Sequence, residues 1–197
     1  MDLSHITYQG PAIDDAGILD ELPENLAGLL NQLNGFIQYG GGLHLRGACL
    51  APDWHALRAA WKGEIAFHVL YPAVLPQHVP FAEDCVGDQF LLDDKRVLKL
   101  HAETGDLEDM GLSLGGVLEA ALADPVNFLG MDPLMQHLKT GNLPEGYLLS
   151  VYPPFCTKEA ANGVSLRPVP AHELHALHAE MAAAFASGDT VRFRITD

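Results

Sequence analysis

The sequence predicts an α+β fold in which helices pack against a mainly antiparallel sheet. Three observations predict it. Apolar residues recur at helical spacing in several separate segments, and two apolar stretches flank a polar turn as in a β-hairpin. No internal repeat, low-complexity tract or serine-rich linker divides the 197 residues. We therefore expect a single domain spanning residues 1–197.

Leucines at helical spacing predict the first helix, within residues 22–33. Pro23 suits its first turn, and Gly35 is placed to end it. The segment "PDWHALRAAWKG" predicts a second helix, with Asp53 as N-cap and Gly63 at its end. The next segment, "IAFHVLY", predicts an apolar strand, followed by a proline-punctuated connection.

Three consecutive glycines, Gly40, Gly41 and Gly42, separate two short strand-like stretches in "FIQYGGGLHLRG". A phosphate-binding loop would end in Lys-Ser/Thr and lead into a helix, but a strand-like stretch follows here. We therefore expect a tight backbone corner that needs positive φ, with no nucleotide or other cofactor.

The clearest strand signal is the hairpin formed by 90–92 and 97–100 around a polar turn. The next helix begins after Ser113, its expected N-cap, and ends before Pro125. We expect this helix to cover the inner face of the hairpin, because an antiparallel sheet commonly buries only one side.

Beyond Pro125 we expect a short helix in "DPLMQHLKTG", a strand in "GYLLSVYPPF", a long helix from about Ala171 to Ser187 and a closing strand in "TVRFRIT". His175 and His178 are helical neighbours and candidate metal ligands, but the metalloprotease spacing of four residues is absent. We expect no metal site, and a solvated or partner-facing histidine flank. The apolar stripe should comprise Leu174, Leu177, Met181 and Phe185.

The chain is strongly acidic, with 26 Asp and Glu against 11 Lys and Arg and a formal net charge of -15. Such a field repels nucleic acid and anionic membranes and attracts basic partners, although solubility alone also accounts for it. No apolar run approaches the roughly 20 residues that cross a bilayer. The first residues lack the pattern of a secretory signal, so we expect a cytoplasmic protein.

Signatures of enzymes are missing. No G-x-S-x-G motif occurs, and Cys49, Cys85 and Cys156 lie in no recognised nucleophile motif. Carboxylates cluster instead, and a solvated acidic rim that serves as a docking face is favoured over acid-base catalysis or cation binding. The residues expected to contact a partner are Glu83, Asp84, Asp88, Asp93, Asp94, Glu103 and Asp106.

The order of parts resembles the SUKH superfamily of small α+β domains. Its members carry an Asn-Gly helix end, a glycine corner, a strand segment of the pattern PFA-D-GD-F-LD and a following helix. The resemblance covers about residues 20–125. It departs at Ser113-Leu114, where Ser-Phe is usual, in a long insertion from about Ala51 to Val79, and in the elaboration at about 126–197. The matching positions are Asn34, Gly35, Gly40, Gly41, Pro80, Phe81, Ala82, Asp84, Gly87, Asp88, Phe90, Leu92 and Asp93.

Bacterial members of the superfamily are commonly immunity proteins that bind a toxin's catalytic domain, often a nuclease or a deaminase. The resemblance therefore implies a non-enzymatic module that occludes a basic toxin domain, and the acidic charge has the complementary sign. The alternatives are a regulatory or scaffold protein that binds several partners or a small ligand, and a metal-dependent enzyme that uses His175 and His178.

Overall fold

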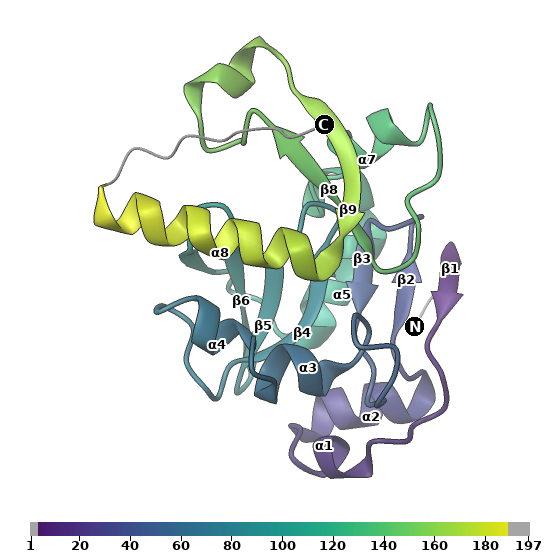
Figure 1. The fold of residues 1–197 in the computed structure, drawn as a ribbon. Helices are drawn as coiled ribbons and strands as arrows, with labels where there is room; N and C mark the ends of the chain where they lie inside the picture. Colours follow the sequence, from purple (N-terminus) through teal and green to yellow (C-terminus); the bar gives the residue numbers. More distant parts are fainter. Residues whose placement is uncertain (1–3, 189–197) are drawn as a thin grey trace.

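The computed structural model describes residues 4–188 and confirms the α+β class. Its main sheet has seven strands, and β8 and β9 form a separate antiparallel pair (Figure 1). The sheet is a meander, because each strand pairs antiparallel with the strand that precedes it in the chain. The strands are β1 (Ile6–Gln9), β2 (Phe36–Gln38), β3 (Leu43–Leu45), β4 (Val79–Asp84), β5 (Gln89–Asp93), β6 (Arg96–His101), β7 (Asp106–Asp109), β8 (Tyr147–Tyr152) and β9 (Ser165–Pro170).

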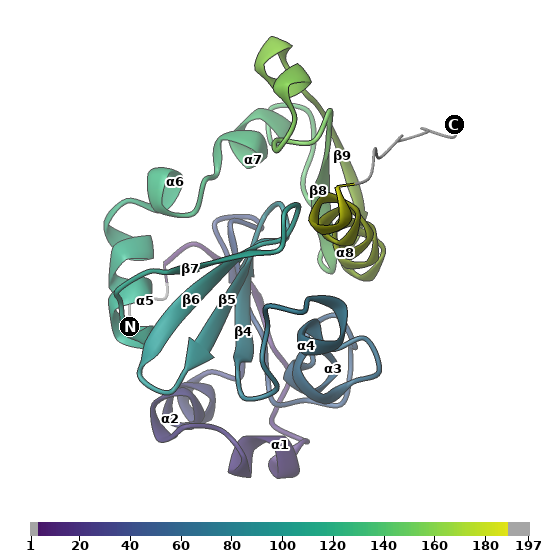
Figure 2. The same cartoon turned by 90° about the vertical axis from the view of Figure 1, so that its left-hand side faces the viewer.

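Helices lie on both sides of the sheet. Figure 2 shows α5 and α6 on one side and α3, α4 and α8 on the other. None of the helices within residues 4–188 is long and apolar enough to cross a membrane. The helices are α1 (Ala16–Asp20), α2 (Glu24–Gln32), α3 (Leu57–Lys62), α4 (Phe67–Leu70), α5 (Leu114–Ala123), α6 (Pro125–Phe128), α7 (Asp132–His137) and α8 (Ala171–Ser187), with a 3-10 turn at Lys158–Asn162.

Several predicted elements are confirmed. Pro23 is the N-cap residue of α2, and Gly35 follows the end of this helix with a φ of 76°. The Ser113 hydroxyl accepts a hydrogen bond from the Gly116 amide at the start of α5. The residues of α5 that face the sheet pack with Phe90 in the larger core, so α5 covers the hairpin as expected.

The expectation that the hairpin buries only one face is wrong. Phe90, Leu92 and Val97 belong to the core shared with α2 and α5, whereas Leu91 and Leu98 belong to a second core with α4 and α8. Consecutive apolar residues in β5 fit this arrangement, since neighbouring side chains in a strand point to opposite faces.

Two local predictions are also wrong. Asp53 does not cap α3, because turns occupy residues 51–55 and the helix begins only at Leu57, with Ala56 as N-cap. The apolar segment expected as a strand forms α4 instead, since a short apolar run does not by itself distinguish a strand from a helix.

The segment expected as a proline-rich connection contains β4, a central strand. Pro80 is tolerated there because the pairing with β5 shifts register between Pro80 and Ala82, as at a β-bulge. The strand β4 is buried along its whole length despite this bulge.

The C-terminal part follows the predicted order as far as α8, which crosses the sheet on the side of α3 and α4 (Figures 1 and 2). The expected apolar stripe is partly wrong, because Leu177 and Phe185 are exposed. Small side chains allow a helix to lie close to a sheet, and alanines occupy much of the covered face. The buried residues of α8 are Ala171, Leu174, His178, Ala179, Met181 and Ala182. The closing strand expected in "TVRFRIT" lies outside the described residues.

Candidate functional site

Three turns meet at one end of the sheet, because the strands that they connect alternate in direction. They are the glycine turn at 39–42, the turn at 85–88 and the turn at 102–105. The backbone has φ angles of 67° at Gly40 and 111° at Gly41. The expected glycine corner is therefore the β2–β3 turn, and it needs residues without a side chain.

The centre of this end of the sheet is the buried carboxylate of Glu83, which is 1% exposed. Its Oε2 accepts hydrogen bonds from Arg46 Nη2 at 2.7 Å, Gln89 Nε2 at 3.0 Å and His175 Nε2 at 2.8 Å. Its Oε1 lies 2.8 Å from His44 Nδ1. These five residues are defined as the Glu83 network.

Strand register assembles most of this network. His44 lies directly opposite Glu83 in the β3–β4 pairing, and Arg46 lies two residues along the chain on the same face. Gln89 comes from β5, and His175 reaches the carboxylate from α8. The network therefore joins three strands to a helix that is distant in the chain.

Two further groups extend the network away from Glu83. His44 Nε2 lies 2.9 Å from His55 Nδ1, and the rings of the two histidines stack with centroids 5.1 Å apart. His55 Nε2 lies 3.1 Å from the Asn34 carbonyl oxygen, which ends the chain of contacts. Both nitrogens of each ring are thus engaged.

Burial alone would raise the pKa of Glu83, but Arg46, His175 and His44 hold it well below its usual value. Burial lowers the pKa of His44 despite the neighbouring carboxylate. Burial also lowers the pKa of His55 to about 4, and the nearby His44 acts in the same direction. At neutral pH the network therefore contains one carboxylate opposite one guanidinium, and burial disfavours the charged forms of His44 and His55.

A cavity of about 270 Å³ lies beside the Glu83 network. Glu83 and His44 line one part of it, and Gly40 and Gly41 line another. Much of the remaining wall is apolar, and Glu145 and Asn142 add polar groups. The apolar part of the wall is formed by Ile37, Leu138, Leu143, Pro144, Leu148 and Ala171.

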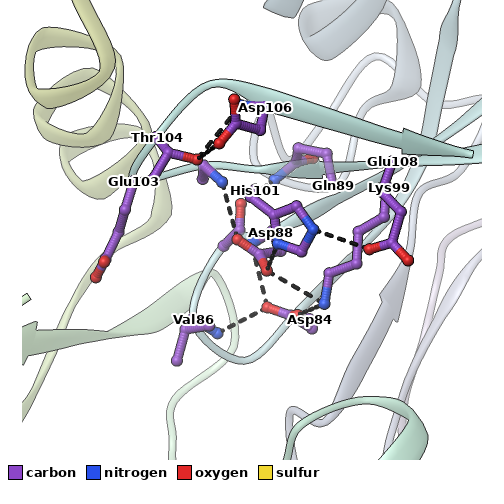
Figure 3. Close-up of polar contacts among 12 residues, drawn as sticks. Asp84, Val86, Asp88, Gln89, Lys99, His101, Glu103, Thr104, Asp106 and Glu108 are labelled. Carbon is purple, nitrogen blue, oxygen red and sulfur yellow. Dashed lines mark hydrogen bonds and ion pairs between the residues drawn. The ribbon is translucent and has the colours of Figure 1, made fainter. Parts of the chain in front are cut away.

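A second cluster of charges lies in the turn after β4 (Figure 3). Lys99 Nζ lies 3.1 Å from Asp84 Oδ2 and 3.2 Å from Asp88 Oδ2. Asp84 Oδ1 accepts hydrogen bonds from the backbone amides of Val86 and Asp88, and Asp88 Oδ1 accepts one from Ala102. Lys99 therefore forms ion pairs with two largely buried carboxylates.

Burial and the neighbouring Asp88 raise the pKa of Asp84 to about 7. Burial also opposes the charge on Asp88, but His101 and Lys99 lower its pKa below the usual value. The two carboxylates therefore differ in their tendency to hold a proton, which is expected for two acids that share one cation.

The expected acidic rim is wrong for part of its residues. Glu83 and Asp84 are buried, with exposed fractions of 1% and 2%. Glu103 accepts hydrogen bonds from the backbone amides of Phe155 and Cys156, so it holds a loop in place. The structure also separates the set, because Asp93 and Asp94 lie at the opposite end of the hairpin from the other five residues.

Exposed carboxylates remain on β7, the last strand of the sheet. Asp106, Glu108 and Asp109 are exposed, and we define them as the β7 edge. Asp94 is also exposed, in the turn between β5 and β6. The partner-contacting role expected for Asp94 and Asp106 stays a prediction.

The histidine flank of α8 comprises His172, His175 and His178, and it is on the solvent side as expected only at His172. His175 contacts Glu83 and is half-buried, and His178 is 5% exposed, with no hydrogen-bond partner for Nδ1. Within residues 4–188 no three His, Cys, Asp or Glu side chains are grouped as metal ligands would be.

No protein family model matches the chain, and comparisons with curated proteins and with solved structures find no match.

Sequence reasoning missed the Glu83 network. A signal exists in "LHLRG", where His44 and Arg46 alternate with leucines, as polar residues on one face of a strand do. This pattern is also typical of a strand with a solvated face. The cover that makes the face buried comes from later segments of the chain, with Phe67 of α4 over the Arg46 guanidinium, Trp54 against the His44 ring and His175 of α8 on Glu83.

Proposed function

We propose that the protein is a non-enzymatic binding module that docks a basic protein domain. The observation that carries this proposal is the distribution of charge. The formal net charge is -15, and the β7 edge presents three exposed carboxylates along one edge strand. A surface of this kind speeds the encounter with a cationic partner.

Ion pairs within the chain remove equal numbers of positive and negative charges, so the acidic excess remains after pairing. Five basic side chains lie between 2.6 and 3.1 Å from a carboxylate of the same chain, and Arg46 and Lys99 among them are buried or largely buried. A lysine or arginine paired with a carboxylate contributes little to the long-range field, and neither does its partner, which on the β7 edge is Asp109 beside Arg96. The basic residues in these pairs are Arg46, Arg58, Lys62, Arg96 and Lys99.

The chemistry of the cysteines supports binding over nucleophilic catalysis. Burial raises the pKa of Cys49 to about 11 and, together with Glu103, that of Cys156 to about 12. Burial likewise raises the pKa of Cys85. Thiols with raised pKa values stay protonated at neutral pH and are poor nucleophiles.

The finer proposal is that the partner is the catalytic domain of a toxin, a nuclease or a deaminase, and that the protein is an immunity protein acting in the bacterial cytoplasm. The resemblance to the SUKH superfamily supports it, through the helix end at Asn34-Gly35, the glycine turn and the strand β4. A nuclease surface must attract phosphate, so it carries the charge that complements this protein.

The test is co-expression with the product of a neighbouring toxin gene, followed by stopped-flow measurement of the association rate. We expect a complex whose association rate falls steeply between about 50 and 500 mM salt. Substituting the β7 edge with lysines (D106K/E108K/D109K) should lower the rate at least about tenfold at low salt.

The matched control changes the net charge equally at three exposed carboxylates elsewhere, as D20K/D53K/E64K. This variant should lose much less of the association rate. An equal loss in both variants would overturn the placement on β7, and a rate that does not respond to salt would overturn the charge argument.

The cavity is the specific observation that favours a second candidate function, recognition of a small ligand by a regulatory protein. It combines an apolar wall with two buried polar side chains, His44 and Glu83, which is typical of small-molecule sites. The cavity and the β7 edge share no residue, so the two candidates are separable by mutation.

A further inference from the structure

We infer that the cavity beside Glu83 binds a small organic amine, a protonated ammonium group on an apolar body about the size of a benzene ring with a short chain. The inference rests on the second candidate function and is independent of the basic protein partner.

The size of the cavity limits the ligand. At about 270 Å³ it is larger than a cavity of about 150 Å³, which admits benzene, and it lies just below the range of about 300 to 1,000 Å³ typical of small-molecule pockets. It therefore fits a ligand of roughly ten heavy atoms.

The residues that line the cavity favour a ligand that is largely apolar. Side chains of Ile37, Leu138, Leu143 and Leu148 line the space, together with Ala171 at the start of α8. On one side the space is bounded by Gly40 and Gly41, where the absence of side chains keeps the turn open to it. A hydrocarbon ring or short chain would bury apolar surface against these groups.

The polar groups of the cavity favour a ligand that donates a hydrogen bond. Glu83 Oε2 already accepts three hydrogen bonds, whereas Oε1 accepts one, from His44 Nδ1. Since a carboxylate oxygen carries two lone pairs, Oε1 retains one acceptor position, and Glu83 is among the residues that line the cavity. The ring nitrogens of His44 are both engaged, so they do not offer a free donor to an acidic ligand.

Charge selects a cation over an anion. Two carboxylates, Glu83 and Glu145, line the cavity, and the lining residues within the described chain include no lysine or arginine. Arg46 keeps Glu83 ionised but also offsets its charge, so Glu145 supplies most of the attraction for a cation and Glu83 supplies a hydrogen-bond acceptor. The formal net charge of -15 adds a general attraction for cations.

The test compares three probes of matched size, phenethylamine, ethylbenzene and phenylpropionate, by amide chemical shifts in a titration of the full chain. We expect phenethylamine to bind with a dissociation constant on the order of 1 mM or below, with shifts at Gly40, Gly41 and Gly146. Phenylpropionate should bind at least about tenfold more weakly.

Two variants locate the ligand. Leu138→Trp places a large side chain into the cavity and should abolish binding, whereas Leu122→Trp, at an exposed position on α5 outside the cavity, should not. Glu145→Gln should weaken phenethylamine about three- to tenfold and leave ethylbenzene unchanged, because only the amine interacts with the carboxylate.

The inference is overturned if phenylpropionate binds as tightly as phenethylamine, or if L138W and L122W bind phenethylamine equally. The lysine variant of the β7 edge serves as a separate control. It should bind phenethylamine within about threefold of the wild type, so that loss of the protein partner and loss of the amine are distinguishable.

Discussion

His175 on α8 contacts Glu83 on β4 through its Nε2 at 2.8 Å, although 92 residues separate the two in sequence. The contact places an imidazole of the last helix on the most buried carboxylate of the sheet. The helix α8 therefore makes a polar contact in the interior of the protein, in addition to the apolar contacts of its alanines with the second core.

Replacing Glu83 with glutamine should lower the free energy of unfolding by about 3 to 5 kcal/mol, because Arg46 would remain buried without its counter-charge. Urea denaturation followed by circular dichroism measures this change. The control is Glu108→Gln on β7, where the side chain is exposed and the change should stay within about 0.5 kcal/mol. A Glu83→Gln protein as stable as the control would contradict the central role given to this carboxylate.

Replacing Lys99 with methionine should destabilise the protein more at pH 8 than at pH 5. Without the lysine, Asp84 and Asp88 lose their shared cation, and among the described residues only His101 remains paired with Asp88, so burial and mutual repulsion raise the pKa of Asp84 in the folded state further above its unfolded value. Stability gained by holding a proton is present at low pH and is lost as the pH rises.

Urea denaturation at pH 5 and pH 8 measures the free energy of unfolding. Its decrease from pH 5 to pH 8 should be larger in Lys99→Met than in the wild type by at least about 1 kcal/mol. Adding Asp84→Asn to this variant removes one of the two charges and retains an oxygen that accepts from the amides of Val86 and Asp88. The double variant should recover stability at pH 8, and a failure to recover would mean that the lysine acts through packing alone.

Replacing His178 with leucine should reduce the loss of stability on acidification. Burial lowers the pKa of His178 to about 4, with the nearby His175 acting in the same direction, so the unfolded state takes up the proton first. The stability contributed by a depressed pKa is present above about pH 6.5 and is lost as the pH falls toward 4. Between pH 7 and pH 5 the variant should lose less stability than the wild type, by on the order of 1 to 2 kcal/mol.

The measurement is the midpoint of urea denaturation at a series of pH values. His172→Gln provides the control, because His172 is exposed on the same helix, and its pH profile should match the wild type. Parallel profiles for His178→Leu and the wild type would show that this imidazole does not carry the acid sensitivity.

Replacing Gly41 with valine should lower the melting temperature by several degrees. The backbone there has a φ of 111°, and a Cβ atom would lie 2.7 Å from Leu143 Cδ2. Gly28→Ala is the opposite case, since this glycine is exposed on α2 and a Cβ atom added to it would meet no atom within 4 Å. Alanine there should stabilise the helix by up to about 1 kcal/mol. Scanning calorimetry distinguishes the two, and equal shifts in both variants would contradict the argument.

Local signals are sufficient to predict much of the fold. Helix spacing and caps identify α2 and α5, and two apolar stretches around a polar turn identify β5 and β6. These features depend on residues close together in the chain, which is where propensity and periodicity act. Pro80 shows the limit, because only the bulge in the β4–β5 pairing explains a proline in a central strand.

The candidate site depends on contacts that the sequence does not display. Glu83, Asp84 and Asp88 resemble a solvated cluster in the sequence, since a carboxylate is usually exposed unless it is paired. The partners that permit their burial are Arg46, just after β3, and Lys99 from β6, which become neighbours only through the order of the strands. The sequence likewise does not show that His178 is buried. His178 shares the buried side of α8 with several alanines, and alanines alone do not identify the side of a helix that packs against a sheet.

The meander topology has a consequence for the order of assembly during synthesis. From β2 to β7, each newly made strand pairs with the strand made just before it, and every connection is a short turn except the one between β3 and β4, which holds α3 and α4. Glu83, Arg46 and Gln89 can therefore come together before α8 has left the ribosome. His175 and the apolar face of α8 are made later than these strands, so we expect the charged centre to form in contact with water and to be covered only when α8 docks.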